Sequence, residues 1–465
     1  MRGRAIIAIL TTSLLAAAAS AATAPEAVRA EAREILRTAV GIDTAAGQEN
    51  VPKLAEYLAG KLRDGGFAPA DIHIVPFGET ASLVARYPGD GSGGKPILLL
   101  AHLDVVPARR SDWQRDPFTL VEEGGYFFGR GTYDVKGEVA ALVATLVGLK
   151  HDGFVPTRDV VLVFSGDEET AQATAQDLVD HHRDLVDAEL AINSDGGGGL
   201  LDDATGAAHV FYLQGAEKTS ATYELVTRNP GGHSSEPRDD NAIYDLAKAL
   251  DKLAAFRFPV QWNDWTLGSF RETGKVTAGD VGQAMRRFAA DPHDAAAAEL
   301  LFHQPTYVGR TRTTCVATML AAGHAENALP QSADATVNCR IFPGTTPQAV
   351  RDTLAKLVGE GVEVKLDDDP QGAPASPLRQ DVVDAATKAV HASYPGVPIV
   401  PDMAPYATDG KIFRAAGIPT YGASGIFLKP KDDFAHGLNE RIPVAAFDAD
   451  LVHWSVLVRA LAGKS

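Results

Sequence analysis

Short apolar runs alternate with helical segments over the first half of the chain. The runs PILLLAHLD, VVLVFSGDEE and AELAINSDGG are nearly continuous in apolar residues, which is typical of strands buried on both faces of a parallel sheet. Residues 25–40 and the segment KGEVAALVATLVGLKHDG have the apolar spacing of helices. This alternation predicts an α/β domain in which helices pack on a central sheet.

The pattern changes near residue 213. The segment TSATYELVTRNPGG alternates with period two, and the helical segment NAIYDLAKALDKLAAF follows it. After residues 257–310, which we interpret as irregular, two strands, a helix and a strand complete the order of a split βαβ, or ferredoxin-like, domain. We therefore expect a main domain formed by residues 25–212 and 378–465, with residues 213–377 inserted into it as an α+β domain.

The N-terminus has the layout of a secretory signal peptide. Arg2 and Arg4 precede the apolar run AIIAILTTSLLAAAAS, and small residues follow it. We predict a signal peptide over residues 1–24, with cleavage after Ala21 or Ala24 and a periplasmic or secreted product that is free of the membrane. An uncleaved membrane anchor is the alternative interpretation.

Charge and cysteine content narrow the possible partners and chemistry. The net charge of −17 argues against nucleic acid, because phosphate binding needs a basic surface. Cys315 and Cys339 lie in two strand-like stretches, at equal distances along the chain from Asn327. Antiparallel pairing about that loop would place them opposite each other, so a disulfide and two buried, unbonded thiols both remain open.

Five segments place acidic or histidine side chains where strands or loops end. The residues are His102 in AHLDVV, Asp134 in GRGTYDVKG, Glu169 in FSGDEET, Asp195 in INSDGGGG and His436 in DFAHGLNE. The carboxyl ends of strands in an open α/β sheet meet at one edge, where ligands collect. Several carboxylates gathered there repel one another, and a pair of divalent cations removes that repulsion. Mixed histidine and carboxylate ligands favour zinc, although cobalt or manganese would also bind.

Two further acids have roles beside a metal. Glu168 is adjacent to Glu169, so one carboxylate can bind metal while the other takes a proton from water. Asp104 lies two residues after His102, on the same side of an extended segment, and can accept a hydrogen bond from its ring. Taken singly, Asp134 could equally be a helix N-cap, Glu168 and Glu169 a solvated acidic turn, and His436 an ordinary loop histidine.

The motifs together resemble those of a known family. AHLDVVP, GRGTYDVKG, DEE, SDGG, GGHSSEP and FAHGLNE are similar, in content and order, to the motifs of the M20 family of dinuclear zinc exopeptidases and deacylases. The stretch from HLDVVPA to GRG looks most like the carboxypeptidase S and N-acyl-amino-acid hydrolase branch. The resemblance implies a mixed sheet flanked by helices, with the inserted ferredoxin-like domain serving as a lid and dimerisation module.

The resemblance also implies a role for each residue. Asp134 would bridge two Zn²⁺ ions, with His102 and Asp195 completing one site, Glu169 and His436 the other, Glu168 as general base and Asp104 as the partner of His102. In the lid, His233 would polarise the scissile carbonyl, in its own active site or that of a neighbouring subunit. Asn327 and Arg340 would hold the carboxylate or carbonyl of the substrate. The chain departs from the family pattern at Thr170-Ala171-Gln172, where a glycine pair is usual.

These expectations favour one function over two rivals. The first is an exported dinuclear zinc hydrolase that cleaves an amide or peptide bond next to a free carboxylate, as a carboxypeptidase or dipeptidase does. An aminoacylase acting on N-acyl amino acids is the closest alternative, because only the pocket for the acyl group distinguishes the two. A catalytically inactive peptide-binding protein is the third, and it would have no need of Glu168.

Overall fold

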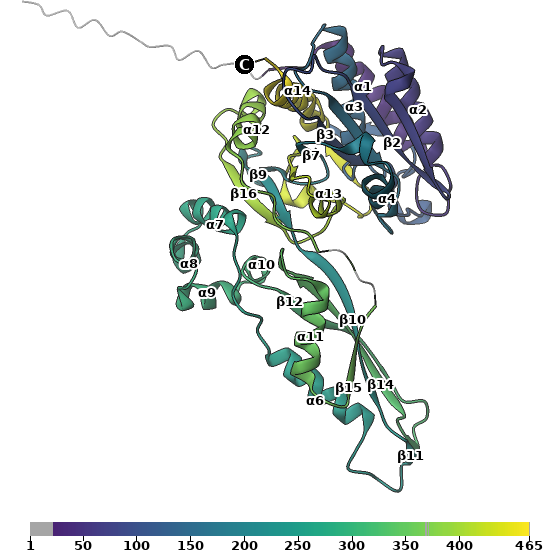
Figure 1. Cartoon of the computed structure of the whole chain (residues 1–465), viewed down its shortest axis with the longest axis vertical. Coiled ribbons are helices and arrows are strands. Elements are labelled where there is room, and N and C mark those ends of the chain that lie inside the picture. The colour runs from purple at the N-terminus through teal and green to yellow at the C-terminus, as the bar shows by residue number, and fades with distance from the viewer. Residues whose placement is uncertain (1–21, 368–369, 371, 465) are drawn as a thin grey trace, which may run out of the picture.

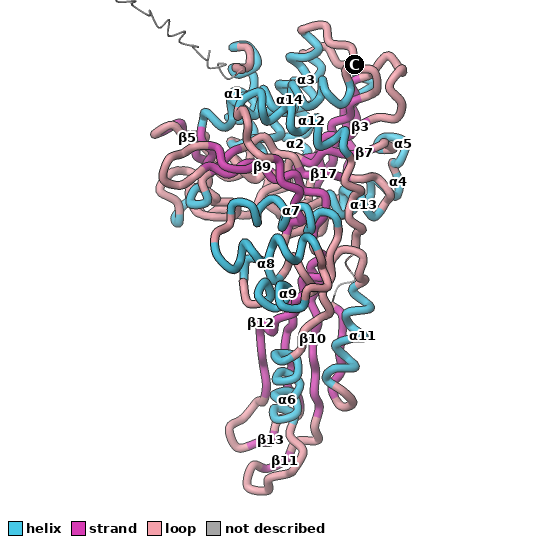
Figure 2. Tube along the Cα trace, turned by 90° about the vertical axis from the view of Figure 1, so that its left-hand side faces the viewer, coloured by secondary structure: helices cyan, strands magenta, loops and turns pink. Residues whose placement is uncertain are grey.

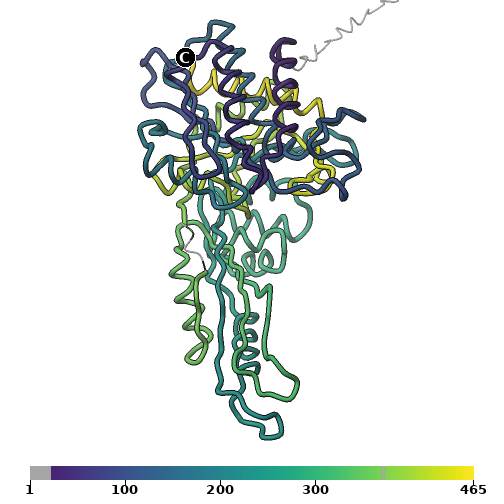
Figure 3. Tube along the Cα trace, turned by 90° about the vertical axis from the view of Figure 1, so that its right-hand side faces the viewer, coloured from purple at the N-terminus to yellow at the C-terminus, as the bar shows by residue number. Residues whose placement is uncertain are grey.

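The molecule is elongated, with a broad α/β body at one end and a narrow domain that projects from it (Figures 1 and 3). The computed structural model describes residues 22–367, 370 and 372–464. Residues 1–21, which carry most of the predicted signal peptide, lie outside the described residues. Within the described part of the chain, no helix is both long and apolar enough to cross a bilayer.

The body is built on a ten-stranded mixed sheet. Its order is β1-β2-β6-β3-β7-β17-β9-β8-β18, with β16 also paired to β9. Strands β6, β3, β7 and β17 run parallel to one another. The strands are β1 (Ile72–Phe77), β2 (Thr80–Tyr87), β3 (Ile97–His102), β6 (Val160–Ser165), β7 (Leu190–Asn193), β8 (Gly198–Leu201), β9 (Ala208–Glu217), β16 (Ile399–Ala404), β17 (Thr420–Gly422) and β18 (Phe427–Leu428).

Helices cover both faces of this sheet, as the apolar strands require. Successive side chains of a strand point to opposite faces, so Leu99 of β3 joins one core while Leu98 and Leu100 join another. The first core is covered by α1 (Glu26–Val40), α2 (Val51–Asp64), α3 (Lys136–His151), α12 (Gln380–Ser393) and α14 (Val444–Ala462). The second is covered by α4 (Ala173–His181), α5 (Arg183–Val186) and α13 (Gly410–Ala415). The predicted α/β sheet flanked by helices is therefore confirmed (Figure 2).

The projecting domain has the predicted ferredoxin-like topology. Its antiparallel sheet has the order β12-β14-β10-β15, and α6 and α11 pack on it. Its elements are β10 (Thr219–Arg228), α6 (Ala242–Ala255), β12 (Thr314–Ala322), β14 (Ser332–Ile341), α11 (Pro347–Val358) and β15 (Val362–Leu366). A short pair, β11 (Gly232–His233) with β13 (Ala328–Leu329), lies at its far tip (Figures 1 and 2).

The interpretation of residues 257–310 as irregular was wrong. Four helices occupy this stretch, namely α7 (Asp264–Val276), α8 (Gly279–Ala290), α9 (Ala295–Phe302) and α10 (Pro305–Val308). Asn263 and Thr266 form a capping box that starts α7. Trp265 is buried in the core of the body, where its indole N–H donates to the Ser376 carbonyl at 2.7 Å. Part of the predicted insert therefore belongs to the packing of the body.

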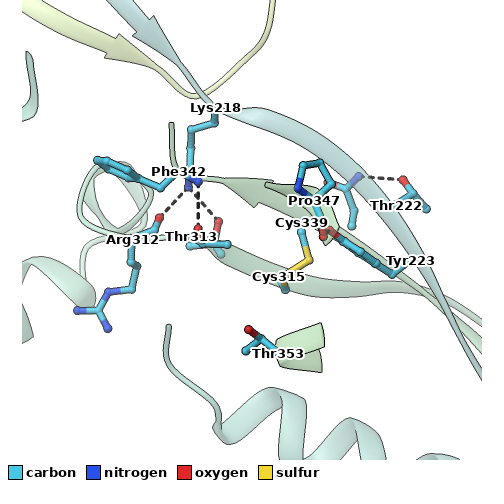
Figure 4. The surroundings of a disulfide bond; sticks show 12 residues. Lys218, Thr222, Tyr223, Arg312, Thr313, Cys315, Cys339, Phe342, Pro347 and Thr353 are labelled. Atoms are coloured by element: carbon cyan, nitrogen blue, oxygen red, sulfur yellow. Dashed lines mark hydrogen bonds between the residues drawn. A yellow bond between two sulfur atoms is a disulfide. The ribbon is translucent and has the colours of Figure 1, made fainter. Parts of the chain in front are cut away.

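A disulfide joins Cys315 to Cys339 at the root of the projecting domain (Figure 4). The two residues are direct partners in the β12–β14 register, as their equal spacing from Asn327 suggested. Of the two open interpretations, the structure shows the bonded one. Next to it, the ammonium of Lys218 donates to the Arg312 carbonyl at 2.9 Å.

Removing this disulfide should destabilise the protein. The bond closes a loop between residues 24 apart in sequence, and restricting an unfolded loop of that length is worth about 3 kcal/mol. We expect the double variant Cys315→Ala/Cys339→Ala to lose roughly that much free energy of unfolding in denaturant titrations. Treating the wild-type protein with a thiol reductant should reproduce the loss, and an unchanged midpoint in both experiments would exclude a stabilising bond.

A buried carboxyl pair links α3 to α14 behind the sheet. Glu138 accepts hydrogen bonds from Ser424 and from the indole of Trp454. Burial raises the pKa of Glu138 to about 7, and it raises the pKa of Asp450, which faces Glu138, well above its usual range. Ionising both carboxyls would place two like charges close together in a buried site, at a high cost in free energy. The pair therefore holds at least one proton near neutral pH.

Stability should therefore fall as the pH rises through this pair. A pKa raised from 4.5 to about 7 stabilises the fold fully below 4.5, and the effect is lost as the pH passes 7. That shift corresponds to an upper limit of about 3 kcal/mol. Asp450→Asn removes one titrating member, so the free energy of unfolding of this variant should change less between pH 5 and 8 than that of the wild type. Parallel pH profiles of the two proteins would contradict this account.

Candidate metal centre and active site

Five elements bring the candidate ligands to one edge of the sheet. His102 is the last residue of β3, and Asp195 follows β7, its parallel neighbour. Glu169 lies in the turn after β6, on the other side of β3. Asp134 lies two residues before the start of α3. His436 belongs to the loop before β19 (Arg441–Pro443), which pairs with β5 (Tyr126–Phe128) and through it with β4 (Val121–Glu123).

The ligands form two triads that share Asp134. His102, Asp134 and Asp195 make one group, and Asp134, Glu169 and His436 make the other. One oxygen of Asp134 lies 3.0 Å from His102 Nε2, and its other oxygen lies 3.1 Å from His436 Nε2. His436 Nε2 is also 2.9 Å from a Glu169 oxygen. Each oxygen of the shared carboxylate therefore faces a different triad, which is the arrangement expected of a bridging ligand.

The protonation of the centre shows how strongly these charges interact. Hydrogen bonds that its ring donates to the carboxylates of Asp134 and Glu169 raise the pKa of His436 to about 10. Burial raises the pKa of Asp195 well above its usual range, and the neighbouring acids reinforce this shift. For Asp134, the two histidines outweigh burial and hold its pKa below the usual range. The acids and imidazoles of the centre thus shift one another's pKa strongly, and divalent cations could neutralise the same carboxylates.

The residues present fit a pair of cations. Among the described residues, the Glu169 Oε1 atom is buried without a hydrogen-bond partner, which is costly unless a ligand satisfies it. Each triad combines one imidazole with two carboxylates, a set that suits zinc with a position left open. The His436 side chain is 57% exposed, so the centre is open to solvent on that side.

Asp104 contacts His102 through both its main chain and its side chain. His102 Nδ1 lies 3.0 Å from the main-chain carbonyl of Asp104 and 3.4 Å from its carboxylate. That carboxylate also accepts the backbone N–H groups of Glu168 and Glu169, at 3.1 and 3.0 Å. The chain bends after β3, which turns the carbonyl toward the imidazole. Asp104 thus faces His102 Nδ1 with both its carbonyl and its carboxylate, and the carboxylate also holds the turn that carries the two glutamates.

Glu168 lies beside the triads without belonging to either. Burial raises its pKa to about 8, and the neighbouring acids Asp409, Glu169 and Asp134 add to the effect while His102 opposes it. Gln172 donates a hydrogen bond of 2.6 Å to its carboxylate. Gln172 lies in the segment that replaces the family's glycine pair, so this departure places a donor against the candidate base.

Sequence reasoning assigned no role to Glu440 or Arg130. The buried Glu440 carboxylate accepts the backbone N–H groups of Tyr133 and Asp134, at 2.8 and 3.0 Å, and the Arg130 guanidinium at 2.6 Å. Arg130 also donates to the His436 carbonyl at 3.3 Å. This pair joins the loops that carry Asp134 and His436. Glu440 follows His436 by four residues within the same motif, and that spacing was the available signal.

The three predicted lid residues lie outside the centre. His233 and Asn327 are exposed at the far tip, where the Asn327 carbonyl accepts the N–H of Ser234 (Figure 1). The His233 ring contacts the Ser235 hydroxyl at 2.8 Å. Arg340 is exposed near the root of the lid, opposite Thr314 in the β12–β14 pairing. Within one chain, the structure does not bring these side chains together with the two triads.

Comparison with known proteins matches this arrangement to a family. Residues 98–460 match the model of peptidase family M20/M25/M40. The chain belongs to this family. It is 30% identical over 360 residues to the N-fatty-acyl-amino acid synthase/hydrolase PM20D1 of Xenopus tropicalis, covering 76% of this chain and 70% of that protein. Identity to the probable carboxypeptidase S-like 2 of Dictyostelium discoideum is 28% over 384 residues, covering 78% and 71%.

A solved structure supports the same assignment at the level of the fold. The M20 family metallo-carboxypeptidase Sso-CP2 from Sulfolobus solfataricus aligns over 93% of this chain and 99% of its own, with a TM-score of 0.69 and 21% identity. The predicted M20 membership is therefore confirmed, and the chain is a hydrolase of peptide-type C–N bonds. The two triads are its candidate metal sites.

Proposed function

We propose that the chain is an exported dinuclear zinc hydrolase that cleaves an amide bond next to a free carboxylate. The observation that carries the proposal is that the carboxylates of the centre fall into two kinds, those placed to bind metal and one acid beside them. Asp134 faces both triads, while Glu168 stays beside them with no ligand role. A site that only stored metal would have no use for a half-buried, unliganded acid of raised pKa.

Each residue then has a defined task. His102 and Asp195 would hold one cation, Glu169 and His436 the other, and Asp134 both. The bound cations would polarise the scissile carbonyl and make water a better nucleophile. Glu168 takes the proton from that water and returns it to the leaving nitrogen, while Gln172 keeps its carboxylate oriented. Asp104, Glu440 and Arg130 hold the three loops in position.

The nature of the acyl group separates the two candidate substrates. The names of the relatives point both ways, since one is called an N-fatty-acyl-amino acid synthase/hydrolase and two are called carboxypeptidases. A panel of dipeptides, N-blocked dipeptides and N-acyl amino acids, assayed with the zinc-loaded protein, distinguishes them. Turnover of at least one class that is lost when the α-carboxylate is amidated supports the proposal. No turnover of any member, or equal turnover of the amidated forms, contradicts it.

We further propose that two copies associate through the lid. Strand β12 is one of the two edge strands of the lid sheet, and its side chains Val316, Met319 and Leu320 are 60%, 68% and 62% exposed. An exposed apolar edge strand is suited to pairing with another chain. A dimer would also give His233 a route to a neighbouring active site. Sedimentation should show a dimer that Met319→Lys/Leu320→Lys dissociates, and a wild-type monomer at all concentrations would exclude it.

Export is the remaining part of the proposal. The basic and apolar start of the chain and the disulfide both suit an oxidising compartment outside the cytosol. Expression of the full chain in a bacterial host, followed by sequencing of the N-terminus, tests it. A mature protein that starts after Ala21 or Ala24 in the periplasm or medium supports export, whereas an intact Met1 in the cytosol contradicts it.

A further inference from the structure

A second cleft lies at the root of the lid, between α6, the helices α9 and α10, and the start of β12. Its volume is about 750 Å³, within the range of sites for small molecules. Apolar side chains from separate elements line it, including Leu250, Phe256, Phe258, Phe302 and Val308. It shares no residue with the two triads, so its occupant would not be the substrate in the act of hydrolysis.

One wall of this cleft carries a buried and unpaired positive charge. Arg312 is only 6% exposed, yet no carboxylate among the described residues lies within 4 Å of it. Its Nε atom has no hydrogen-bond partner in the described part of the chain, and Nη1 makes one long contact of 3.4 Å to the Phe258 carbonyl. A buried charge is normally paired, but the Glu299 carboxylate, whose charge acts on Arg312, already forms its ion pair with Arg257, so Arg312 can accept an anion from outside the chain.

The neighbouring Arg257 has the ion pair that Arg312 lacks. Arg257 pairs with both oxygens of Glu299, at 2.8 and 2.7 Å. The guanidinium carbons of Arg257 and Arg312 lie 4.1 and 4.7 Å from the centroid of the Phe302 ring. This ring contact helps to hold the Arg312 fork in place, but it supplies no negative charge. Figure 4 shows the Arg312 side chain directed away from Lys218 and from the disulfide.

The two threonine hydroxyls of the wall are already engaged within the protein. The Thr313 hydroxyl contacts Gln261 at 3.2 Å and accepts the N–H of Phe342 at 3.0 Å. The Thr314 hydroxyl faces the Lys218 ammonium at 3.4 Å. The one acid of the α6 wall, Asp251, is exposed to solvent. A ligand body rich in amides or hydroxyls would lose its own hydrogen bonds in this cleft, whereas an aliphatic chain would lose none.

We propose that this cleft binds a long-chain carboxylate, with the carboxylate on the Arg312 fork and the aliphatic chain against the phenylalanines. A planar guanidinium pairs with a carboxylate through two parallel hydrogen bonds. The aliphatic chain displaces water from the apolar walls. The site is separate from the proposed hydrolytic reaction and does not depend on it.

Titration calorimetry of the full-length, metal-loaded enzyme with decanoate tests this inference. We expect one decanoate site per chain outside the metal centre, and binding about tenfold or more weaker for Arg312→Leu, because a charge-assisted pair is lost. The matched control is Arg228→Leu, which removes an exposed arginine from β10 of the same lid and should leave binding unchanged. The uncharged probe 1-decanol should bind the wild type at least about tenfold more weakly than decanoate, a comparison that needs no variant.

Four results would overturn the inference. The first is equal decanoate affinity in wild type and Arg312→Leu, and the second is equal affinity for decanoate and 1-decanol. The third is a decanoate affinity, measured by calorimetry, that falls as the protein concentration is raised to the range in which sedimentation shows a dimer. That result would show that a second copy of the chain covers the cleft. Competitive inhibition of hydrolysis that persists unchanged in Arg312→Leu would assign the bound decanoate to the metal centre instead.

Discussion

Replacing Glu168 by glutamine should lower kcat by about 100- to 10,000-fold while the metal content stays unchanged, because general base catalysis contributes that much. Glutamine has nearly the same shape and can still accept the hydrogen bond that Gln172 donates at 2.6 Å. It cannot take a proton from water. Glu168 belongs to neither triad, so both metal sites should fill as in the wild type.

A matched control distinguishes this effect from a general loss of charge. Glu79 is an exposed acid in the turn between β1 and β2, outside the triads, and Glu79→Gln should leave kcat unchanged. The measurement is kcat and KM on one chosen substrate, together with metal analysis of each purified protein. If Glu168→Gln keeps more than a tenth of wild-type kcat, Glu168 is not the base. If its metal content falls, Glu168 is a ligand.

Asp134→Asn should disrupt both metal sites at once. The two oxygens of Asp134 face different triads, and an amide offers only one oxygen ligand. We expect metal content to fall below one equivalent per chain and kcat/KM to fall by about 1,000-fold or more, since the cations supply several kcal/mol of transition-state stabilisation. Metal analysis after dialysis against metal-free buffer measures the first effect, and steady-state kinetics measures the second.

Asp203→Asn is the control for this change. Asp203 is exposed after β8 and takes no part in the triads, so its variant should bind metal and turn over substrate as the wild type does. A variant of Asp134 that keeps two equivalents of metal would show that the carboxylate does not bridge. Loss of one equivalent with the other retained would assign Asp134 to a single site.

Much of the metal centre could be predicted because its signals are local. His102, Glu169 and Asp195 each come at or just after an apolar strand, and parallel strands must end at one edge of the sheet. The ferredoxin-like lid was predictable for a similar reason, because its alternating strands and amphipathic helices follow one another along the chain.

The features that were missed depend on contacts between distant segments. Glu440 lies about three hundred residues from the loop whose N–H groups it accepts, and nothing in either segment alone specifies that pairing. The hydrogen bonds that the Asp104 carboxylate accepts from Glu168 and Glu169 also join segments distant in sequence, so the residue spacing around His102 did not reveal them. The helices after residue 263 could have been found, because the capping box at Asn263 and Thr266 is a local signal.

The account makes one central claim, that hydrolysis requires two cations held by the two triads with Glu168 as the base. Titrating Zn²⁺ into chelator-treated, full-length enzyme while recording activity and bound metal tests this claim most directly. We predict no turnover without metal, saturation of bound zinc at two equivalents per chain, and full activity only as the second equivalent binds. Full turnover by the metal-free protein, or zinc saturation with no turnover of any substrate in the panel, would contradict it.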